Sequence, residues 1–180
     1  GEPMRQADFV LAVCRLCKEA GLHVALDTCG TVPWERYERV LPLLDLVLYD
    51  LKIFDAERHR ASTGVDNGPI LEHARRIAAA GKPMWIRTPV IPGHTASAAN
   101  IGALGDFIAA ELPTVQRWDL LAYTNLGQPK YHRLDRPYGL EGVPLLTRAE
   151  MEALHAVALQ RVDVAVWSGA TRAEDVEVGK

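Results

Sequence analysis

The feature that most constrains the fold is a repeated alternation between short apolar runs and segments with helical spacing. Apolar runs of this length, separated by amphipathic helices and short loops, are typical of a parallel sheet with right-handed crossovers. We therefore predict an α/β fold that forms a single domain over residues 1–180. The predicted strands lie within 22–30, 45–52, 83–93, 115–123 and 162–167, and the predicted helices within 9–20, 32–44, 70–81, 97–112 and 147–161.

Composition and charge exclude several classes of function. The chain has 180 residues, 48% of them hydrophobic, and a formal net charge of −3, which gives no electrostatic argument for binding nucleic acid or anionic membranes. No apolar run approaches the roughly 18 residues that span a bilayer, and no signal peptide precedes the first helix. Three cysteines form an odd count that fits a reducing environment better than a disulfide framework, so we expect a cytoplasmic protein.

Polar residues recur where the predicted strands end. The carboxyl ends of parallel strands meet at one edge of the sheet, and ligands of barrels and open α/β sheets bind at that edge. The residues concerned are Asp27, Thr28, Asp50, Lys52, Arg87, Tyr123, Thr124 and Asn125. Residues 125–146 form a long loop rich in Gly, Pro and Tyr, which we interpret as a lid or wrapping segment. The C-terminal region, 147–180, adds a helix, a possible last strand and a tail.

Several stretches together resemble the activating enzymes of glycyl-radical enzymes, a branch of the radical S-adenosylmethionine (SAM) superfamily. They are similar to that family's GGEP turn, LDTNG or LDTCG segment and DLVLxDLK segment, and to three further blocks in the family's order. The matching stretches are "GEP" at Gly1, "ALDTCG", "LVLYDLK", "HRASTGVDNGPIL", "IRTPVIPGHTASAANI" and "LLAYTNLGQPKY". They extend from Gly1 to about Lys130, and the ordered set is far more specific than any one block.

The resemblance implies a partial (β/α) barrel of the radical SAM type, which is an incomplete TIM-like barrel. It implies an oxidoreductase that cleaves SAM reductively to a 5′-deoxyadenosyl radical. The radical then abstracts hydrogen from a glycine of a partner glycyl-radical enzyme. The implied cofactors are SAM and a 4Fe–4S cluster, and the implied electron donor is a flavodoxin or ferredoxin. No acid–base catalytic residue is implied, because the cofactor carries the reaction.

The resemblance also assigns SAM-binding positions. Backbone groups of Gly1, Glu2 and Pro3 would face the SAM amino group, and Lys52 and Arg87 would meet its carboxylate. Asp27 would lie beside the same ligand. Val90, Ile91 and Pro92 would contact the adenine. Thr124 and Asn125 stand where the family often has a His or Asn that reaches the ribose or adenine, and the shorter Thr124 departs from that pattern.

A monovalent cation site is implied beside SAM. The resemblance places its ligands at Asp27, Thr28 and Asp50, and oxygen ligands suit hard cations. The alternative is that these side chains cap neighbouring helices at the strand ends. A second alternative concerns Lys52 and Arg87, which could instead form ion pairs with Asp50 or Asp55. For Gly1–Pro3 the alternative is an ordinary turn before a helix.

The family's C-x-x-x-C-x-x-C cluster loop is absent from the sequence. Cys14 and Cys17 lie at helical spacing in an apolar stripe, which favours packed core thiols over a redox pair, and Cys29 is expected to be a small buried side chain. None of the six histidines shows metal-ligand spacing. We therefore interpret the chain as the C-terminal part of a radical SAM enzyme, with the cluster loop upstream.

Two other functions remain as alternatives. The chain could be a non-catalytic half-barrel that binds SAM or a partner, or an unrelated TIM-type lyase with a site at Asp50, Lys52 and Arg87. For the activating-enzyme function, the 125–146 loop is expected to hold the partner. Its residues Tyr131, His132, Arg133 and Tyr138 are of types that often anchor interfaces.

Overall fold

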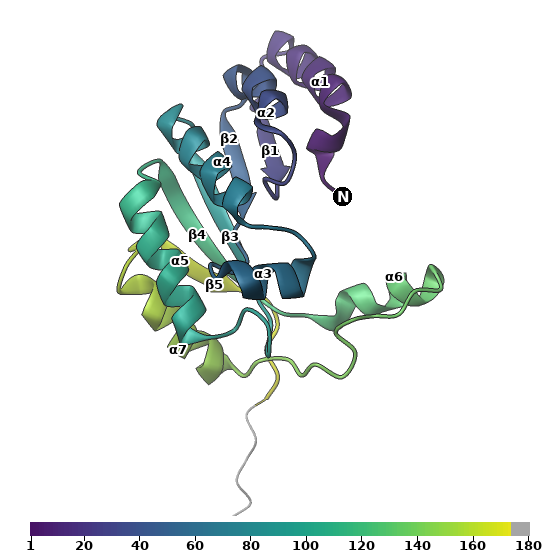
Figure 1. Cartoon of the computed structure of the whole chain (residues 1–180), viewed down its shortest axis with the longest axis vertical. Coiled ribbons are helices and arrows are strands. Elements are labelled where there is room, and N and C mark those ends of the chain that lie inside the picture. Colours follow the sequence, from purple (N-terminus) through teal and green to yellow (C-terminus); the bar gives the residue numbers. More distant parts are fainter. Residues whose placement is uncertain (174–180) are drawn as a thin grey trace, which may run out of the picture.

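The computed structural model describes residues 1–173, so the end of the predicted tail, 174–180, lies outside the described residues. Five parallel strands form one sheet in the order β1-β2-β3-β4-β5 (Figure 1). This confirms the predicted α/β class and all five predicted strands. Their bounds are β1 Ala25–Thr28, β2 Leu46–Asp50, β3 Met84–Val90, β4 Val115–Ala122 and β5 Ala165–Ser168.

Helices connect the strands and differ from the sequence prediction in three places. The 32–44 helix ends early and continues as a 3-10 turn at Pro42. The helix at Ala56–Thr63 was not predicted, and the helix at Gln128–Arg133 lies inside the predicted 125–146 loop. The α-helices are α1 Ala7–Glu19, α2 Trp34–Val40, α3 Ala56–Thr63, α4 Gly68–Ala79, α5 Ala98–Glu111, α6 Gln128–Arg133 and α7 Arg148–Leu159. The 3-10 helices are η1 Pro3–Gln6, η2 Leu41–Leu43 and η3 Asn125–Gly127. No helix in the described part of the chain is long and apolar enough to cross a membrane.

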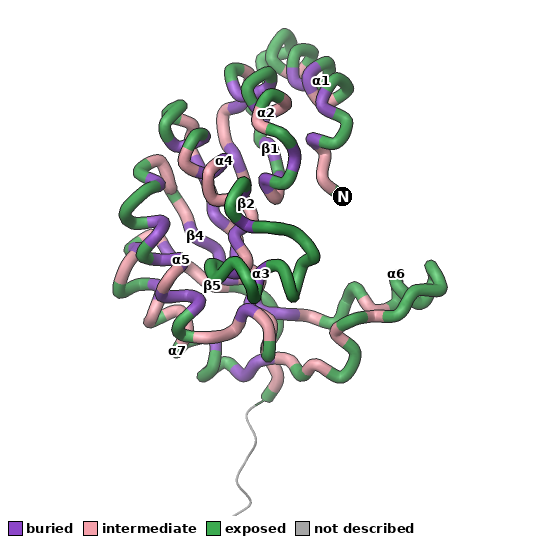
Figure 2. The backbone as a smooth tube through the Cα atoms, in the orientation of Figure 1, coloured by how far each residue is buried: buried purple, intermediate pink, exposed green. Residues whose placement is uncertain are grey.

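The strands of the sheet consist mainly of buried and half-buried residues (Figure 2). On β2 and β3 buried and half-buried side chains alternate, as the two-residue period of a strand requires. The buried face packs against helices: the Tyr49 hydroxyl donates to the Ile70 carbonyl of α4, and Trp118 lies against Gly105 of α5. The opposite face carries Asp27, Asp50 and Arg87, which stay partly exposed. The strand alternation therefore separates a core face from a face that keeps charged groups near solvent.

Apolar side chains are exposed next to β1. Within the described residues β1 has a neighbouring strand on one side, and α1 beside it exposes 66% of Phe9 and 66% of Leu16. A hollow of about 450 Å³ lined mainly by α1 and β1 side chains lies there, with Cys14 and Cys17 in its wall. Cys14 is buried as predicted, and Cys17 is half-buried and packed on the core.

Gly30 fixes the turn that follows β1. Its φ of +74° lies in the left-handed region, and a Cβ atom built on it would overlap the Tyr49 hydroxyl. Its carbonyl accepts a hydrogen bond at 2.9 Å from the ring nitrogen Nδ1 of His73, which is buried in α4. The turn therefore needs a glycine for two separate reasons, its backbone angle and the space that Tyr49 occupies.

The variant Gly30→Ala tests the second reason when it is compared with Gly21→Ala. Gly21 has a similar φ of +71° but open space around it. We expect Gly21→Ala to lower the free energy of unfolding by about 1 kcal/mol through backbone strain. Gly30→Ala should cost about 3 kcal/mol, because overpacking adds to the strain. Urea denaturation followed by circular dichroism measures both. Equal losses would show that Tyr49 does not constrain the turn.

Candidate functional site

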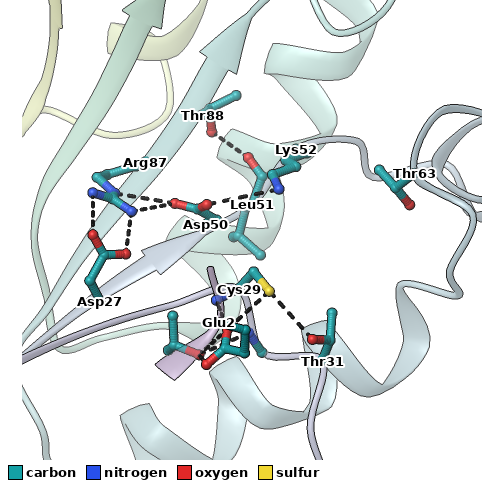
Figure 3. Close-up of polar contacts among 12 residues, drawn as sticks. Glu2, Asp27, Cys29, Thr31, Asp50, Leu51, Lys52, Thr63, Arg87 and Thr88 are labelled. Atoms are coloured by element: carbon teal, nitrogen blue, oxygen red, sulfur yellow. Dashed lines mark hydrogen bonds and ion pairs between the residues drawn. The ribbon is translucent and has the colours of Figure 1, made fainter. Parts of the chain in front are cut away.

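The Arg87 guanidinium joins carboxylates from two neighbouring strands (Figure 3). Asp50 and Arg87 are register partners on β2 and β3, and Arg87 donates to Asp50 Oδ1 from Nη2 at 2.8 Å and from Nε at 3.2 Å. It also forms a two-bond contact with Asp27 at the end of β1. One planar cation therefore ties together the carboxyl ends of β1, β2 and β3.

The surroundings keep this guanidinium charged. Partial burial lowers the pKa of Arg87, but the charges and hydrogen bonds of Asp50 and Asp27 outweigh burial and raise it above its ordinary value. The Arg87 side chain is 23% exposed and Asp27 is 59% exposed, so the Asp27 contact remains open to solvent. A ligand carboxylate could therefore reach Arg87 from the side of Asp27, which is more exposed than the side of Asp50.

The Glu2 carboxylate fixes the N-terminal segment to the end of β1. It accepts hydrogen bonds from the backbone N–H of Met4 at 3.0 Å and of Cys29 at 2.9 Å, and from the Thr28 hydroxyl at 2.9 Å. The Cys29 thiol donates as well, at 3.0 Å, and burial raises the pKa of that thiol, so it keeps its proton. Cys29 is half-buried, so the expectation of a buried side chain was wrong.

The Thr28 hydroxyl lies on the other side of β1 from Asp27. Thr28 is 2% exposed, and its hydroxyl contacts Glu2 and, at 2.9 Å, the buried hydroxyl of Tyr37. Alternation along β1 separates it from Asp27. Of the three residues predicted to bind a monovalent cation, the structure brings Asp27 and Asp50 together through Arg87 and turns the Thr28 side chain away.

A hollow of about 480 Å³ lies between the N-terminal segment and the ends of β1 and β2. Its charged groups include carboxylates and the ammonium of Lys52, whose Nζ is 3.9 Å from Asp50 Oδ2. Opposite charges at one edge of a parallel sheet suit a ligand that carries both an ammonium and a carboxylate, as an amino acid does. The hollow is lined by Gly1, Glu2, Pro3, Asp27, Thr28, Cys29, Asp50 and Lys52.

Six positions predicted to contact SAM do not line this hollow: Arg87, which adjoins it through its bonds to Asp27 and Asp50, and Val90, Ile91, Pro92, Thr124 and Asn125. Val90 is fully buried in the hydrophobic core, and its carbonyl accepts a hydrogen bond from the Tyr123 N–H at 3.1 Å. Thr124 is half-buried and Asn125 is exposed, and both follow β4 at the same edge of the sheet. An apolar contact between the Val90 side chain and adenine therefore has no support from its placement.

The cysteines of this chain do not fit an iron–sulfur cluster. Such a cluster needs several thiolates around one site. Cys14 and Cys17 lie on α1 and Cys29 lies beside Glu2, and all three are free thiols. Among residues 1–173 no group of three or more His, Cys, Asp or Glu side chains could hold a metal ion.

The variant Glu2→Gln tests whether the carboxylate charge holds the N-terminal segment. Burial raises the pKa of Glu2, but the hydrogen bonds from Cys29, Met4 and Thr28 bring it below its ordinary value of 4.5. A carboxyl whose pKa is lowered by folding stabilises the folded state above its ordinary pKa and loses that contribution as pH falls. Glu2→Gln should therefore cost on the order of 1 kcal/mol near neutral pH, and the difference should shrink below about pH 4. Urea denaturation across pH measures this, and a difference that does not change with pH would contradict it.

The sequence is similar to that of a known protein family. The family model "Radical SAM superfamily" matches residues 1–101. The chain is 40% identical over 149 residues to the pyruvate formate-lyase-activating enzyme of Streptococcus mutans, covering 79% of this chain and 56% of that protein. It is 40% identical over 165 residues to the isethionate sulfite-lyase activating enzyme of Nitratidesulfovibrio vulgaris, covering 91% of this chain and 52% of that protein. The chain thus spans about half the length of these curated relatives.

Solved structures agree on the fold. A crystal structure of a domain of the pyruvate-formate lyase-activating enzyme from Bacteroides vulgatus superposes with a TM-score of 0.76 at 26% identity, covering 94% of this chain and 95% of that one. A radical SAM methyltransferase from Sphaerobacter thermophilus superposes with a TM-score of 0.73 at 15% identity, covering 93% of this chain and 48% of that one, which shows the fold alone. The fold is a partial (β/α) barrel, as predicted. The alternative of an unrelated TIM-type lyase is wrong, because the chain belongs to the radical SAM superfamily.

Proposed function

We propose that this chain supplies the SAM-binding edge of a glycyl-radical enzyme activating enzyme. The observation that carries the proposal is the hollow at the carboxyl ends of β1 and β2, which Asp27, Asp50 and Lys52 line. Arg87 adjoins it through its ion pairs with Asp27 and Asp50. The names of the curated relatives, which are activating enzymes, support the assignment.

The charges of the hollow suit the methionine part of SAM. The Lys52 ammonium and the Arg87 guanidinium are donors for the SAM carboxylate, and Arg87 can offer two parallel bonds. The SAM ammonium needs acceptors, and carbonyl groups of Gly1–Pro3 and the carboxylate of Asp27 lie around the same hollow. Glu2 is saturated by hydrogen bonds from this chain and therefore holds the segment in place.

The proposed reaction is a reductive cleavage. When bound and reduced by one electron, SAM would supply a 5′-deoxyadenosyl radical, with methionine as the other product. That radical would take a hydrogen atom from a glycine Cα of the partner, giving 5′-deoxyadenosine and a glycyl radical. This chain binds and orients SAM for that step. The electron would come from a flavodoxin or ferredoxin, and the cluster ligands would belong to the remainder of a longer protein.

Replacing Lys52 tests the SAM site, with Lys18 as a matched control. The two side chains are 37% and 36% exposed and each pairs with one aspartate, but Lys18 bonds Asp45 away from the hollow. In the full-length protein, Lys52→Ala should weaken SAM binding by about tenfold or more, because a charge-assisted bond is lost. Lys18→Ala should leave SAM binding within about twofold.

Calorimetric titration with SAM, without reductant, measures binding, and chromatography of 5′-deoxyadenosine after reduction measures cleavage. Equal effects of the two lysine variants would contradict the proposed site. SAM binding without any cleavage in the reduced full-length protein would favour the alternative of a non-catalytic binding half-barrel.

We further propose that the arm, residues 125–146, contacts the partner. The arm projects from the body of the molecule (Figure 1). It is attached to the end of β4 by a 2.9 Å hydrogen bond between the hydroxyls of Tyr123 and Tyr138, and Tyr131 packs edge-on against Tyr138. Tyr131 is 41% exposed and Leu134 is 57% exposed. An ordered arm with an exposed aromatic anchor suits the recognition of another protein.

The variant Tyr131→Ala tests the arm. In the full-length protein it should lower the yield of glycyl radical on the partner by about tenfold. SAM cleavage without the partner should be unchanged. Leu159→Ala is the matched control, because Leu159 is 44% exposed and lies on α7. Electron paramagnetic resonance measures the radical. An unchanged yield in Tyr131→Ala would show that Tyr131 of the arm does not anchor the partner.

A further inference from the structure

The segment 51–54, between β2 and α3, has an unusual pattern of backbone hydrogen bonds. It has neither helix nor strand structure, yet each of its four carbonyls accepts a hydrogen bond from a side chain of another element. Thr88 Oγ1 donates to the carbonyl of Leu51 at 2.8 Å, and Asn100 Nδ2 donates to that of Lys52 at 2.9 Å. Asn67 Nδ2 donates to the carbonyls of Ile53 at 3.2 Å and Phe54 at 2.7 Å.

The three donors are themselves buried and fixed. Thr88 is fully buried, and its hydroxyl accepts a hydrogen bond from Trp118 Nε1 at 3.0 Å. Asn100 uses both ends of its amide, because its Oδ1 accepts from the Phe54 N–H at 3.0 Å. Asn67 and Asn100 are 3% and 4% exposed. Loops usually satisfy their backbone groups with water, so buried donors dedicated to one short loop indicate that its position matters.

The segment directs one charged side chain into the site. Leu51 and Ile53 are each 2% exposed and anchor it in the core, whereas Lys52 between them is 37% exposed and lines the hollow. The Lys52 ammonium is 3.9 Å from Asp50 Oδ2, which is too far for a hydrogen bond. A lysine stem is flexible, so this ion pair alone does not place the ammonium. Its position must come from the backbone that carries it.

We propose that Thr88, Asn67 and Asn100 are positioning residues that hold the backbone of Lys52 so that its ammonium meets the SAM carboxylate. The proposal rests on the SAM-binding function proposed above. It also gives a role to the "TGVDN" and "SAANI" stretches, which contain Asn67 and Asn100 and lie away from the hollow. These asparagines act through Lys52 and do not touch the ligand.

A double-mutant cycle separates positioning from a merely structural role. In the full-length protein without reductant, Thr88→Val should raise the dissociation constant for SAM by about tenfold, because the Leu51 carbonyl loses its donor and Lys52 shifts. Thr88→Ser keeps the hydroxyl and should bind SAM within about twofold of the unmodified protein. In a Lys52→Ala background, Thr88→Val should change binding by less than about twofold, because the group that it positions is gone.

Thr114→Val is the matched control. Thr114 precedes β4, and its Oγ1 is buried without a hydrogen-bond partner, so the same substitution removes a hydroxyl that binds nothing in the described structure. It should leave SAM binding unchanged. If Thr88→Val does not give a folded protein by circular dichroism, the same cycle is run with Asn100→Asp, which keeps the acceptor for Phe54 and removes the donor to Lys52.

The outcomes are distinct. If Thr88→Val lowers SAM affinity when Lys52 is present but not in the Lys52→Ala background, the result supports the positioning role. If Thr88→Val lowers SAM affinity equally in both backgrounds, or does not lower it, the positioning proposal is overturned and the proposed SAM-binding function still stands. If the unmodified full-length protein does not bind SAM, the proposed function fails and this proposal fails with it.

Discussion

The ion-pair cluster at Arg87 is the interaction on which the rest of the site depends. A single guanidinium connects Asp27 at the end of β1 with Asp50 at the end of β2, so three strands present their charged ends at one place. Because Arg87 pairs with both Asp27 and Asp50, the two negative charges can lie close together at a partly buried edge of the sheet. The same cluster leaves Lys52 beside Asp50 at the border of the hollow.

Much of this arrangement can be predicted from the sequence. The five apolar runs predict the five strands because a parallel sheet buries its strands. The helix predicted within 147–161 is confirmed as α7, where Thr147 and Glu150 form a capping box. The rule that ligands bind at the carboxyl ends of strands selects Asp27, Asp50 and Arg87 before any coordinates are seen. Elements whose hydrophobic pattern follows their structural period are therefore predictable.

The features that escape prediction lack such a pattern. Helix α3, with the sequence "AERHRAST", has no apolar stripe, and His59 is its one buried residue. Thr28 is a different case: it follows Asp27 directly, so alternation along the predicted strand already places the two side chains on opposite faces. Asn67 and Asn100 lie far from Lys52 in sequence, and nothing in the residue pattern indicates that their amides meet the 51–54 segment. Long-range contacts of buried polar groups are set by the packing of helices, so they appear only with the structure.

The most direct test of this account is a crystal structure of the full-length protein with SAM bound. The account predicts that the SAM carboxylate lies within hydrogen-bond distance of Lys52 Nζ or of the Arg87 guanidinium, with the SAM ammonium against the Gly1–Pro3 segment. It also predicts that the 51–54 carbonyls keep their bonds to Thr88, Asn67 and Asn100. A structure in which the methionine part of SAM binds away from this hollow, with Lys52 and Arg87 still paired only with aspartates, would contradict it.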